Sequence, residues 1–349
     1  MGNKQAAGKP SSKLSSPASL SAQSPSASSN MLQANSGKRF KDCFTLGKEL
    51  GKGNYSTVRL AVSVVGKEEC AVKCILKKKL TKEDEDALKI EVKILGAVSH
   101  PNIIKLYGFF EEPQDYYIVT ELMKGGELFD RIVAKDFYSE GDAQKVVRTV
   151  TSCLLYLHDQ DIVHRDLKPE NILLKNKLDD EDLKIADFGF ARYVGSGCAS
   201  SCGTPGYVAP EIITGKLYGK PVDVWSMGVI MFILLCGYPP FYHKNQAQLF
   251  RLIREAKFEF ESPYWDNISG TAKDLIKRCL TVDHTKRITM SQVLQHEWIT
   301  GKASDKDIAN VLGELKRFNA RRKLRAGIKA AIAAGKMSDL AASIKQQSN

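Results

Sequence analysis

The residues best suited to chemistry stand in short runs whose order and spacing are unusual. The first run, Gly51–Val58, is rich in glycine. Glycines let a backbone approach phosphate groups closely and leave its amide donors free to point at them. Fifteen residues beyond Val58, Lys73 follows in the apolar run Cys70–Ile75, where a charge needs a partner. The two runs together indicate phosphate binding, although the first is weak alone because Ser56 replaces the third glycine of a GxGxxG pattern.

The decisive run is HRDLKPEN, at residues 164–171. Asp187-Phe188-Gly189 follows sixteen residues after this run, and Ala209-Pro210-Glu211 comes after a loop rich in glycine and serine. Each triplet alone occurs by chance, but all of them in this order match the motif set of eukaryotic protein kinases. Residues 44–298 therefore resemble a complete protein kinase domain. Three further runs resemble the calcium/calmodulin-dependent group, namely Gly125–Arg131, Cys202–Val208 and Phe318–Leu324.

The resemblance implies transfer of a phosphoryl group from ATP to a protein hydroxyl. Such a reaction has a loose transition state, so positioning and electrostatic stabilisation dominate its catalysis. Asp166 is implied to accept the proton of the substrate hydroxyl, and Lys168 in the same loop is typical of serine/threonine kinases. Lys73 is implied to hold the α- and β-phosphates and to pair with Glu91. The presence of all these residues argues against the alternative of a nucleotide-binding scaffold without transfer activity.

The same resemblance implies ATP and Mg²⁺ as cofactors, bound between two lobes. Asn171 and Asp187 would ligate Mg²⁺, a hard cation that prefers oxygen ligands. Thr120 stands at the family's gatekeeper position, where a small side chain leaves a back pocket open. The residues implied to bind ATP are Leu50, Gly51, Lys52, Gly53, Asn54, Tyr55, Ser56, Thr57, Val58, Ala71, Lys73, Glu121, Met123 and Leu173.

Four acidic residues near these motifs are assigned by resemblance to substrate binding or to structure. Glu127 and Glu170 match positions at which basophilic kinases receive the arginines of a substrate, although two solvated acids are the alternative. Ser or Thr sites with an upstream basic residue are therefore the expected substrates. Glu211 is implied to pair with Arg287, and Asp223 is implied to brace the catalytic loop.

The elements that must position these residues change character along the chain. Residues 44–121 hold short β-type runs with one helical pattern at Glu83–Val98, and residues 122–298 read mainly as helices. We therefore predict an α+β, bilobal protein kinase fold, with a small β-rich N-lobe over 44–121 and a larger helical C-lobe over 122–298. The predicted strands are 44–50, 58–65, 69–75, 106–111 and 116–121, and the later helices lie near 127–134, 139–159, 222–236, 246–256 and 271–280.

Charge and composition separate two tails from this core. The net charge is +11, of which residues 1–43 contribute +5 and residues 300–349 contribute +7. A nucleic-acid-binding domain should carry a basic face, so no nucleic-acid partner is expected for the nearly neutral core. Residues 1–39 contain eleven serines and no acid, so we expect 1–43 to be a disordered basic tail and 341–349 a disordered C-terminus.

The sequence gives no sign of export or of a transmembrane segment. The longest apolar stretch, Val224–Tyr238, is shorter than the roughly twenty residues that a bilayer helix needs, and no secretory signal opens the chain. The eight cysteines form no zinc or disulfide pattern; Cys198 and Cys202 are ordinary thiols or, alternatively, a redox pair. We expect a cytoplasmic protein, with a nuclear location open. Gly2 is a weak candidate for myristoylation because Ala6 replaces the preferred Ser or Thr.

Residues 299–340 are predicted to be an autoinhibitory and calmodulin-binding segment. One apolar stripe has helical spacing and suits packing on the C-lobe: Ile308, Leu312, Leu315 and Phe318. A second stripe, Leu324–Met337, runs among basic residues, which is typical of calmodulin targets but also of helices on anionic membranes or in solvent. The sequence has no EF-hand loop, so calcium would act through a separate calmodulin.

Two positions concern activation. Ser200 matches the activating threonine of type I calmodulin-dependent kinases and Ser201 adjoins it, so an upstream activating kinase would use one of the two. Val311 stands where type II kinases carry an autophosphorylated threonine, and Asn349 ends the chain before any assembly domain. We therefore expect a monomer that phosphorylates protein substrates without the calcium memory of the type II kinases.

Overall fold

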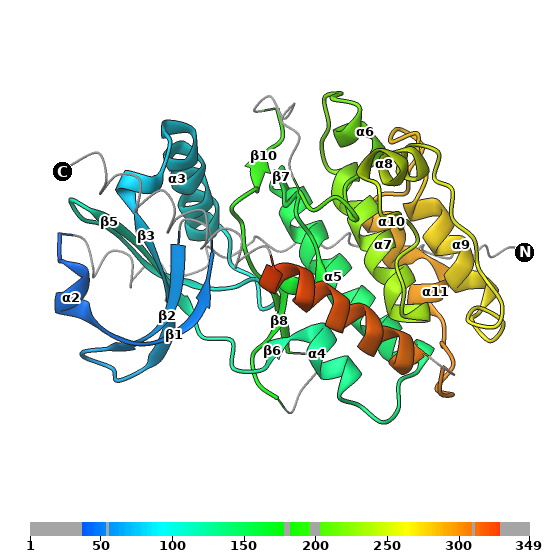
Figure 1. Cartoon of the computed structure of the whole chain (residues 1–349), viewed down its shortest axis with the longest axis horizontal. Coiled ribbons are helices and arrows are strands. Elements are labelled where there is room, and N and C mark those ends of the chain that lie inside the picture. The colour runs from blue at the N-terminus through cyan, green and yellow to red at the C-terminus, as the bar shows by residue number, and fades with distance from the viewer. Residues whose placement is uncertain (1–36, 54–55, 178–181, 196–202, 309–310, 329–349) are drawn as a thin grey trace, which may run out of the picture.

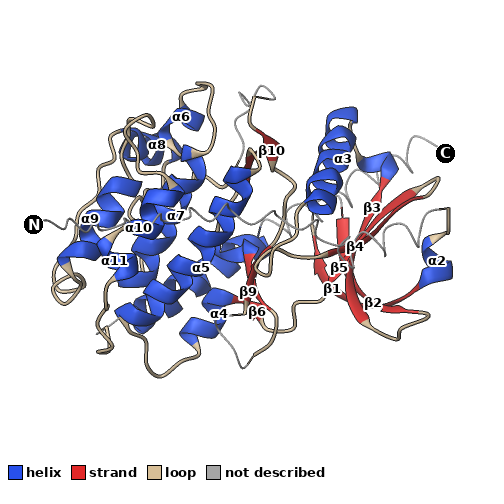
Figure 2. Cartoon of the chain, turned by 180° about the vertical axis from the view of Figure 1, so that it is seen from behind, coloured by secondary structure: helices blue, strands red, loops and turns tan. Residues whose placement is uncertain are grey.

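The computed structural model describes residues 37–53, 56–177, 182–195, 203–308 and 311–328. These residues form a β-rich N-lobe and a mainly helical C-lobe, at the left and right of Figure 1. Figure 2 shows the same division from behind, with the longer strands gathered in the N-lobe. The predicted bilobal α+β architecture is confirmed. Within the described residues, no helix is both long and apolar enough to cross a membrane.

The N-lobe contains one antiparallel sheet of five strands in the order β1-β2-β3-β5-β4. Each predicted strand is present, with ends shifted by at most two residues. The strands are β1 (Phe44–Lys52), β2 (Ser56–Ser63), β3 (Glu69–Leu76), β4 (Leu106–Glu111) and β5 (Asp115–Glu121).

Successive side chains along a strand point to opposite faces of the sheet, so the two faces carry different sets of residues. Residues that stand opposite each other in an antiparallel pair lie on the same face. Val58 pairs with Lys73 and Ala71 pairs with Thr120, so these four side chains share one face. The sheet register thus brings four of the predicted nucleotide-site residues together.

An aromatic cluster around Phe40 packs on the other face of the sheet. The Phe40 ring stacks on Tyr117 at 4.3 Å between centroids and packs edge-on against Phe110 at 5.6 Å. Its backbone N–H donates to Glu112 Oε1 at 2.8 Å. These contacts hold α2 (Phe40–Cys43), four residues that the sequence analysis had placed in the disordered tail.

Helix α3 (Lys82–Ala97) brings Glu91 to the sheet. The helix begins at a capping box in which the Thr81 hydroxyl accepts from the Asp84 N–H and the Asp84 carboxylate accepts from the Thr81 N–H. Such reciprocal bonds satisfy two backbone donors that a helix start leaves free. The start is thereby fixed, and the apolar stripe of the helix faces the sheet together with Glu91, which is 5% exposed.

The C-lobe is built around α7 (Pro221–Cys236), whose residues from Val222 onward are all buried. Its glycine cap, Gly237, has φ +88°, a left-handed conformation that glycine adopts freely. The short helices α6, α10 and α11 were not predicted because they are too brief to show periodicity. The remaining helices are α4 (Leu128–Val133), α5 (Glu140–Asp159), α6 (Pro210–Ile213), α8 (Gln246–Arg254), α9 (Gly270–Cys279), α10 (Met290–Gln295) and α11 (Glu297–Thr300).

Five further strands of two or three residues follow the N-lobe sheet in the described part of the sequence. They are β6 (Gly126–Glu127), β7 (Ile162–Val163), β8 (Ile172–Leu174), β9 (Leu183–Ile185) and β10 (Arg192–Tyr193), and β6-β8-β9 form one small sheet. Gly125 approaches β8 so closely that an added Cβ would lie 2.5 Å from Leu174 Cβ and 2.3 Å from Asn176 O. A glycine is therefore required here to seat β6, which carries Glu127.

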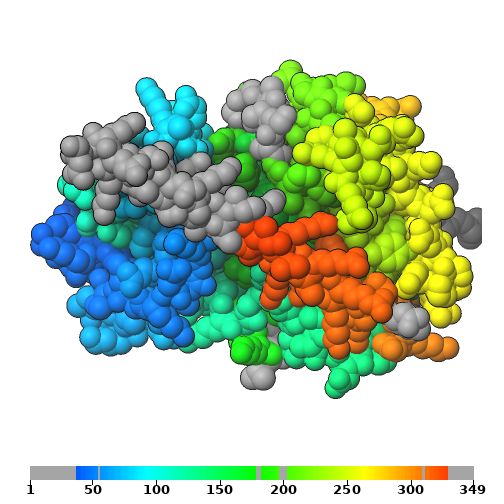
Figure 3. Space-filling model, in the orientation of Figure 1, coloured from blue at the N-terminus to red at the C-terminus, as the bar shows by residue number. Residues whose placement is uncertain are grey.

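Residues 311–328 form a further helix, which we call the C-terminal helix. It lies across the surface of the C-lobe, drawn in orange to red in Figure 3. Val311 and Leu315 are fully buried, and Leu312 and Phe318 pack against the core. The predicted packing of this stripe on the lobe is confirmed.

We expect Phe40→Ala to destabilise the N-lobe by about 3 kcal/mol, because truncating a buried Phe leaves a cavity. Thermal unfolding of the full chain would measure this as a lower midpoint. Phe137→Ala is the matched control, since Phe137 is 50% exposed. Equal midpoints for both variants would contradict a structural role for α2.

Candidate active site

The catalytic loop at residues 164–171 is held from inside the C-lobe by Asp223. The backbone N–H groups of His164 and Arg165 donate to its two carboxylate oxygens, each at 2.9 Å, and His158 Nε2 lies 2.9 Å from Oδ2. Burial opposes the charge of Asp223, but these polar partners outweigh it, so its pKa is lowered. Arg165 also has φ +70°, a conformation that costs roughly 1–3 kcal/mol outside glycine and that this network maintains.

Asp166 is buried at 3% exposure with polar partners on both carboxylate oxygens. Lys168 Nζ donates to its Oδ2, and Thr204 Oγ1 donates to Oδ1 at 3.0 Å. Asn171 Nδ2 donates to the backbone oxygen of Asp166 at 2.8 Å. The structure therefore brings Asp166, Lys168 and Asn171 together, as predicted, and adds Thr204, which the sequence analysis did not select.

Lys73 and Glu91 form the ion pair that the resemblance implied. Lys73 Nζ lies 3.1 and 3.2 Å from the two oxygens of Glu91. Burial opposes the charge of the ammonium, but the Glu91 and Asp187 carboxylates outweigh it, so the pKa of Lys73 is raised. The group therefore stays cationic at neutral pH and suits a phosphate ligand.

The proposed Mg²⁺ ligands lie beside this pair. Phe188 is fully buried against His164, with ring centroids 5.0 Å apart, while Asp187 before it is exposed. Among the described residues, no protein donor occupies the Asp187 carboxylate or the Asn171 side-chain oxygen. These two oxygen groups are therefore available as metal ligands. Together with the cationic Lys73 beside them, they fit a magnesium ion bound to the phosphates of a nucleotide.

The predicted nucleotide site has an apolar lining between the lobes. Val58 and Ala71 come from the sheet and Leu173 from β8, and all three are only partly buried, leaving apolar surface for a planar base. The Glu121 side chain pairs with Lys184 Nζ at 2.9 Å, and the contact predicted for its backbone stays a prediction. Gly51, Lys52, Gly53, Ser56 and Thr57 lie at the β1–β2 turn, while Asn54 and Tyr55 lie outside the described residues.

Comparison with known proteins gives the family. Residues 44–299 match the protein kinase domain family. The chain belongs to the protein kinase family. It is therefore a protein serine/threonine kinase, as predicted, and the family uses ATP with Mg²⁺.

The similar curated proteins are calcium/calmodulin-dependent kinases. The kinase is 46% identical over 288 residues to the type 1 enzyme of Macrobrachium nipponense, covering 82% of this chain and 84% of that protein. It is 47% identical over 288 residues to the type 1 enzyme of Caenorhabditis briggsae, covering 81% of each. It is 45% identical over 306 residues to the type IV enzyme of Mus musculus, covering 86% of this chain and 64% of that one.

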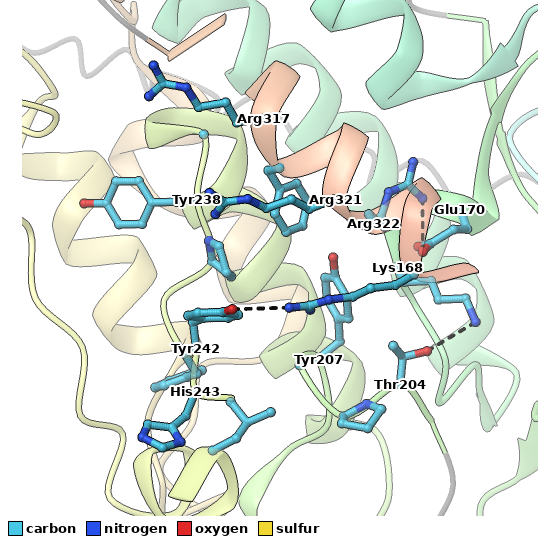
Figure 4. Close-up of a pocket in the computed structure, with 18 of the residues that line it drawn as sticks. Lys168, Glu170, Thr204, Tyr207, Tyr238, Tyr242, His243, Arg317, Arg321 and Arg322 are labelled. Carbon is cyan, nitrogen blue, oxygen red and sulfur yellow. Dashed lines mark hydrogen bonds and ion pairs between the residues drawn. The ribbon is translucent and has the colours of Figure 1, made fainter. Parts of the chain in front are cut away.

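Glu127 and Glu170, the acids predicted to receive substrate arginines, both contact Arg322 of the C-terminal helix. Arg322 Nη2 donates to Glu127 Oε2, and Nη1 lies 3.0 Å from Glu170 Oε1. Figure 4 shows Arg322 reaching Glu170 above the pair of Lys168 and Thr204. The alternative of two solvated acids is therefore wrong, because both carboxylates are paired and the Arg322 side chain is only 10% exposed.

Two supporting ion pairs complete the site, one of them predicted. Arg287 binds Glu211 through two hydrogen bonds at 2.6 and 2.9 Å, in agreement with the sequence analysis. Lys184 was not selected, yet it joins the strand before Asp187 to Glu121 at the end of β5. Its only signal in the sequence was a charge in an apolar strand, which the structure places at 8% exposure.

We expect Asp166→Asn to lower peptide phosphorylation by about 10²–10⁴, the usual contribution of a general base. Binding of Mg·ADP should persist, since Asp166 is not among the nucleotide ligands. Activity and nucleotide affinity of the full chain would be compared with Asp159→Asn, an exposed acid at the end of α5. Near-normal activity of Asp166→Asn would exclude the base role.

Proposed function

We propose that the C-terminal helix keeps this kinase inactive by occupying the substrate-arginine site, and that Ca²⁺-loaded calmodulin removes it. The released enzyme would phosphorylate Ser or Thr with an upstream basic residue. The relatives are named calcium/calmodulin-dependent kinases, which supports the partner. The observation that carries the proposal is the bridge from Arg322 to Glu127 and Glu170.

The bridge would exclude a basic substrate directly. A guanidinium shared by two carboxylates leaves little capacity for a second one, because the same oxygens would have to accept both sets of hydrogen bonds. A tethered arginine also competes at an effective concentration in the millimolar range. A substrate arginine would therefore bind only after Arg322 leaves.

Contacts along the helix support a specific docking. Asp130 accepts from Asn319 Nδ2 at 2.7 Å and from Lys323 Nζ at 2.6 Å. Burial raises the pKa of Asp130, but Lys323 and Asn319 outweigh it, so the net pKa is lowered and the group stays charged. The ring of Phe318 lies 6.5 Å from that of Phe129. Polar and apolar contacts therefore fix the same register.

The outer end of the same helix supports recognition by calmodulin. Leu324 is 65% exposed and Ile328 is 50% exposed, and both stand among basic residues. An exposed apolar stripe with a basic surround is the pattern that calmodulin binds. The rest of the predicted stripe, Ile332 and Met337, lies outside the described residues.

Two further parts of the proposal concern phosphorylation. Val311 has no hydroxyl and is fully buried, which supports an enzyme without calcium memory of the type II form. An upstream kinase acting on Ser200 or Ser201 remains part of the proposal, and both residues lie outside the described ones.

We expect Arg322→Glu to raise calcium-independent activity at least tenfold, because it sets a third carboxylate against Glu127 and Glu170. Breaking a largely buried ion pair typically costs 2–5 kcal/mol. Phosphorylation of an Arg-containing Ser peptide would be measured with Ca²⁺/calmodulin and with chelator. The unmodified chain should be active only with Ca²⁺/calmodulin.

The matched control is Lys316→Glu, which reverses an exposed charge on the same helix. It should leave the calcium-independent activity low. Equal activity of the unmodified chain with Ca²⁺/calmodulin and with chelator would contradict activation by calmodulin. Low calcium-independent activity of Arg322→Glu would remove the bridge from the mechanism.

We also expect Gly237→Ala to release the helix without touching the substrate site. A Cβ at Gly237 would lie 2.6 Å from Glu314 Cβ and 2.8 Å from Val311 O, both in the C-terminal helix. Gly215→Ala is the control, since Gly215 also has a positive φ, +66°, but nothing within 4 Å. Calcium-independent peptide phosphorylation should rise in Gly237→Ala alone. A rise in both variants, or in neither, would contradict this packing role.

A further inference from the structure

The C-terminal helix covers a cavity that it does not fill. The cavity has a volume of about 550 Å³, within the usual range of small-molecule sites, roughly 300–1,000 Å³. It lies between the C-terminal helix and the segments at residues 204–207 and 237–243. Because the helix provides one wall, the cavity exists in this form only while the helix is docked.

The wall provided by the C-lobe is mainly aromatic and apolar. Rings and prolines make up most of it: Pro205, Tyr207, Tyr238, Pro239, Phe241 and Tyr242. Aromatic surfaces of this kind favour a flat aromatic partner through stacked or edge contacts. The body of a fitting ligand is therefore aromatic.

The wall provided by the helix contains more arginines than acidic residues. The acids Glu170 and Glu314 are already paired, with Arg322 and Arg317 respectively. This leaves Arg325, whose Nη2 donates to the neutral Tyr242 hydroxyl at 3.3 Å, and Arg321, for which the described residues contain no carboxylate partner. In Figure 4, Arg321 extends from the helix towards Tyr238.

We propose that this cavity is a binding site for a small aromatic anion, a carboxylate or sulfonate whose ring packs on the aromatic wall and whose charge faces Arg321 and Arg325. A guanidinium without a carboxylate partner offers strong, charge-assisted hydrogen bonds to such an anion. The ligand would bridge the helix and the lobe.

A bridging ligand would strengthen the docked state by mass action. A ligand present at about ten times its Kd would lower the population of the released state about tenfold. This regulatory consequence rests on the proposed autoinhibition, whereas the binding site itself does not.

The test uses anilinonaphthalene sulfonate as the probe, with the full chain in chelator and saturating Mg·ADP to fill the nucleotide site. Its uncharged analogue N-phenylnaphthylamine has the same ring body. We expect fluorescence titration to give one sulfonate site, and much weaker binding of the neutral analogue. Arg321→Gln should weaken sulfonate binding about tenfold, while Arg278→Gln on α9, whose charge pairs with Asp274, should not. Equal affinity of Arg321→Gln and the unmodified chain would overturn the proposal.

The variant Gly237→Ala separates this proposal from the autoinhibition. Displacing the helix should abolish sulfonate binding, while Gly215→Ala should retain it. Raised peptide phosphorylation with unchanged sulfonate binding would overturn the cavity site and leave autoinhibition standing. Lost sulfonate binding with unchanged phosphorylation would support the cavity site and count against autoinhibition.

Discussion

The carboxylate of Asp223 is the constraint on which the site depends. It is fully buried, and an unpaired charge there would cost several kcal/mol. Three donors and its place in the first turn of α7, where the helix dipole favours an anion, offset this cost. Since two of the donors are backbone groups of the catalytic loop, α7 determines where that loop runs. The position of Asp166 therefore derives from the centre of the C-lobe and depends little on the surface around it.

The contacts of Arg322 impose a second constraint. Under the proposed mechanism, Glu127 and Glu170 would bind both a substrate arginine and Arg322, so substrate specificity and inhibition would depend on the same two carboxylates. Weakening either acid to broaden the substrate range would also loosen the helix. The shared contact would thus couple two properties that mutation could otherwise change separately.

Much of the fold and of the candidate site could be predicted from local sequence patterns. The features that were not predicted share one cause. Strands and long helices were found because their periodicity is a local signal, as in the pattern at Glu83–Val98 that the structure shows as α3. The motifs located Asp166, Lys73 and Glu91 because their spacing is specific. In contrast, Lys184 with Glu121, and Arg322 with Glu127, are pairs brought together only by tertiary folding. Phe40 was missed because its partners Phe110 and Tyr117 lie far from it in the sequence, and the cavity was missed because no sequence pattern marks a void.

The helix at residues 311–328 is held unevenly along its length. Val311 and Leu315 in its first half are fully buried, whereas Leu324 and Ile328 are exposed and follow Lys323, the last residue of the described helix that forms an ion pair. If calmodulin releases the helix as proposed, it would bind these exposed residues first, and the buried contacts near Val311 would break afterwards. The rate of release would then rise with the concentration of the partner and would not wait for spontaneous undocking. Under this mechanism, a firmly inhibited kinase would still be activated quickly once the partner is present.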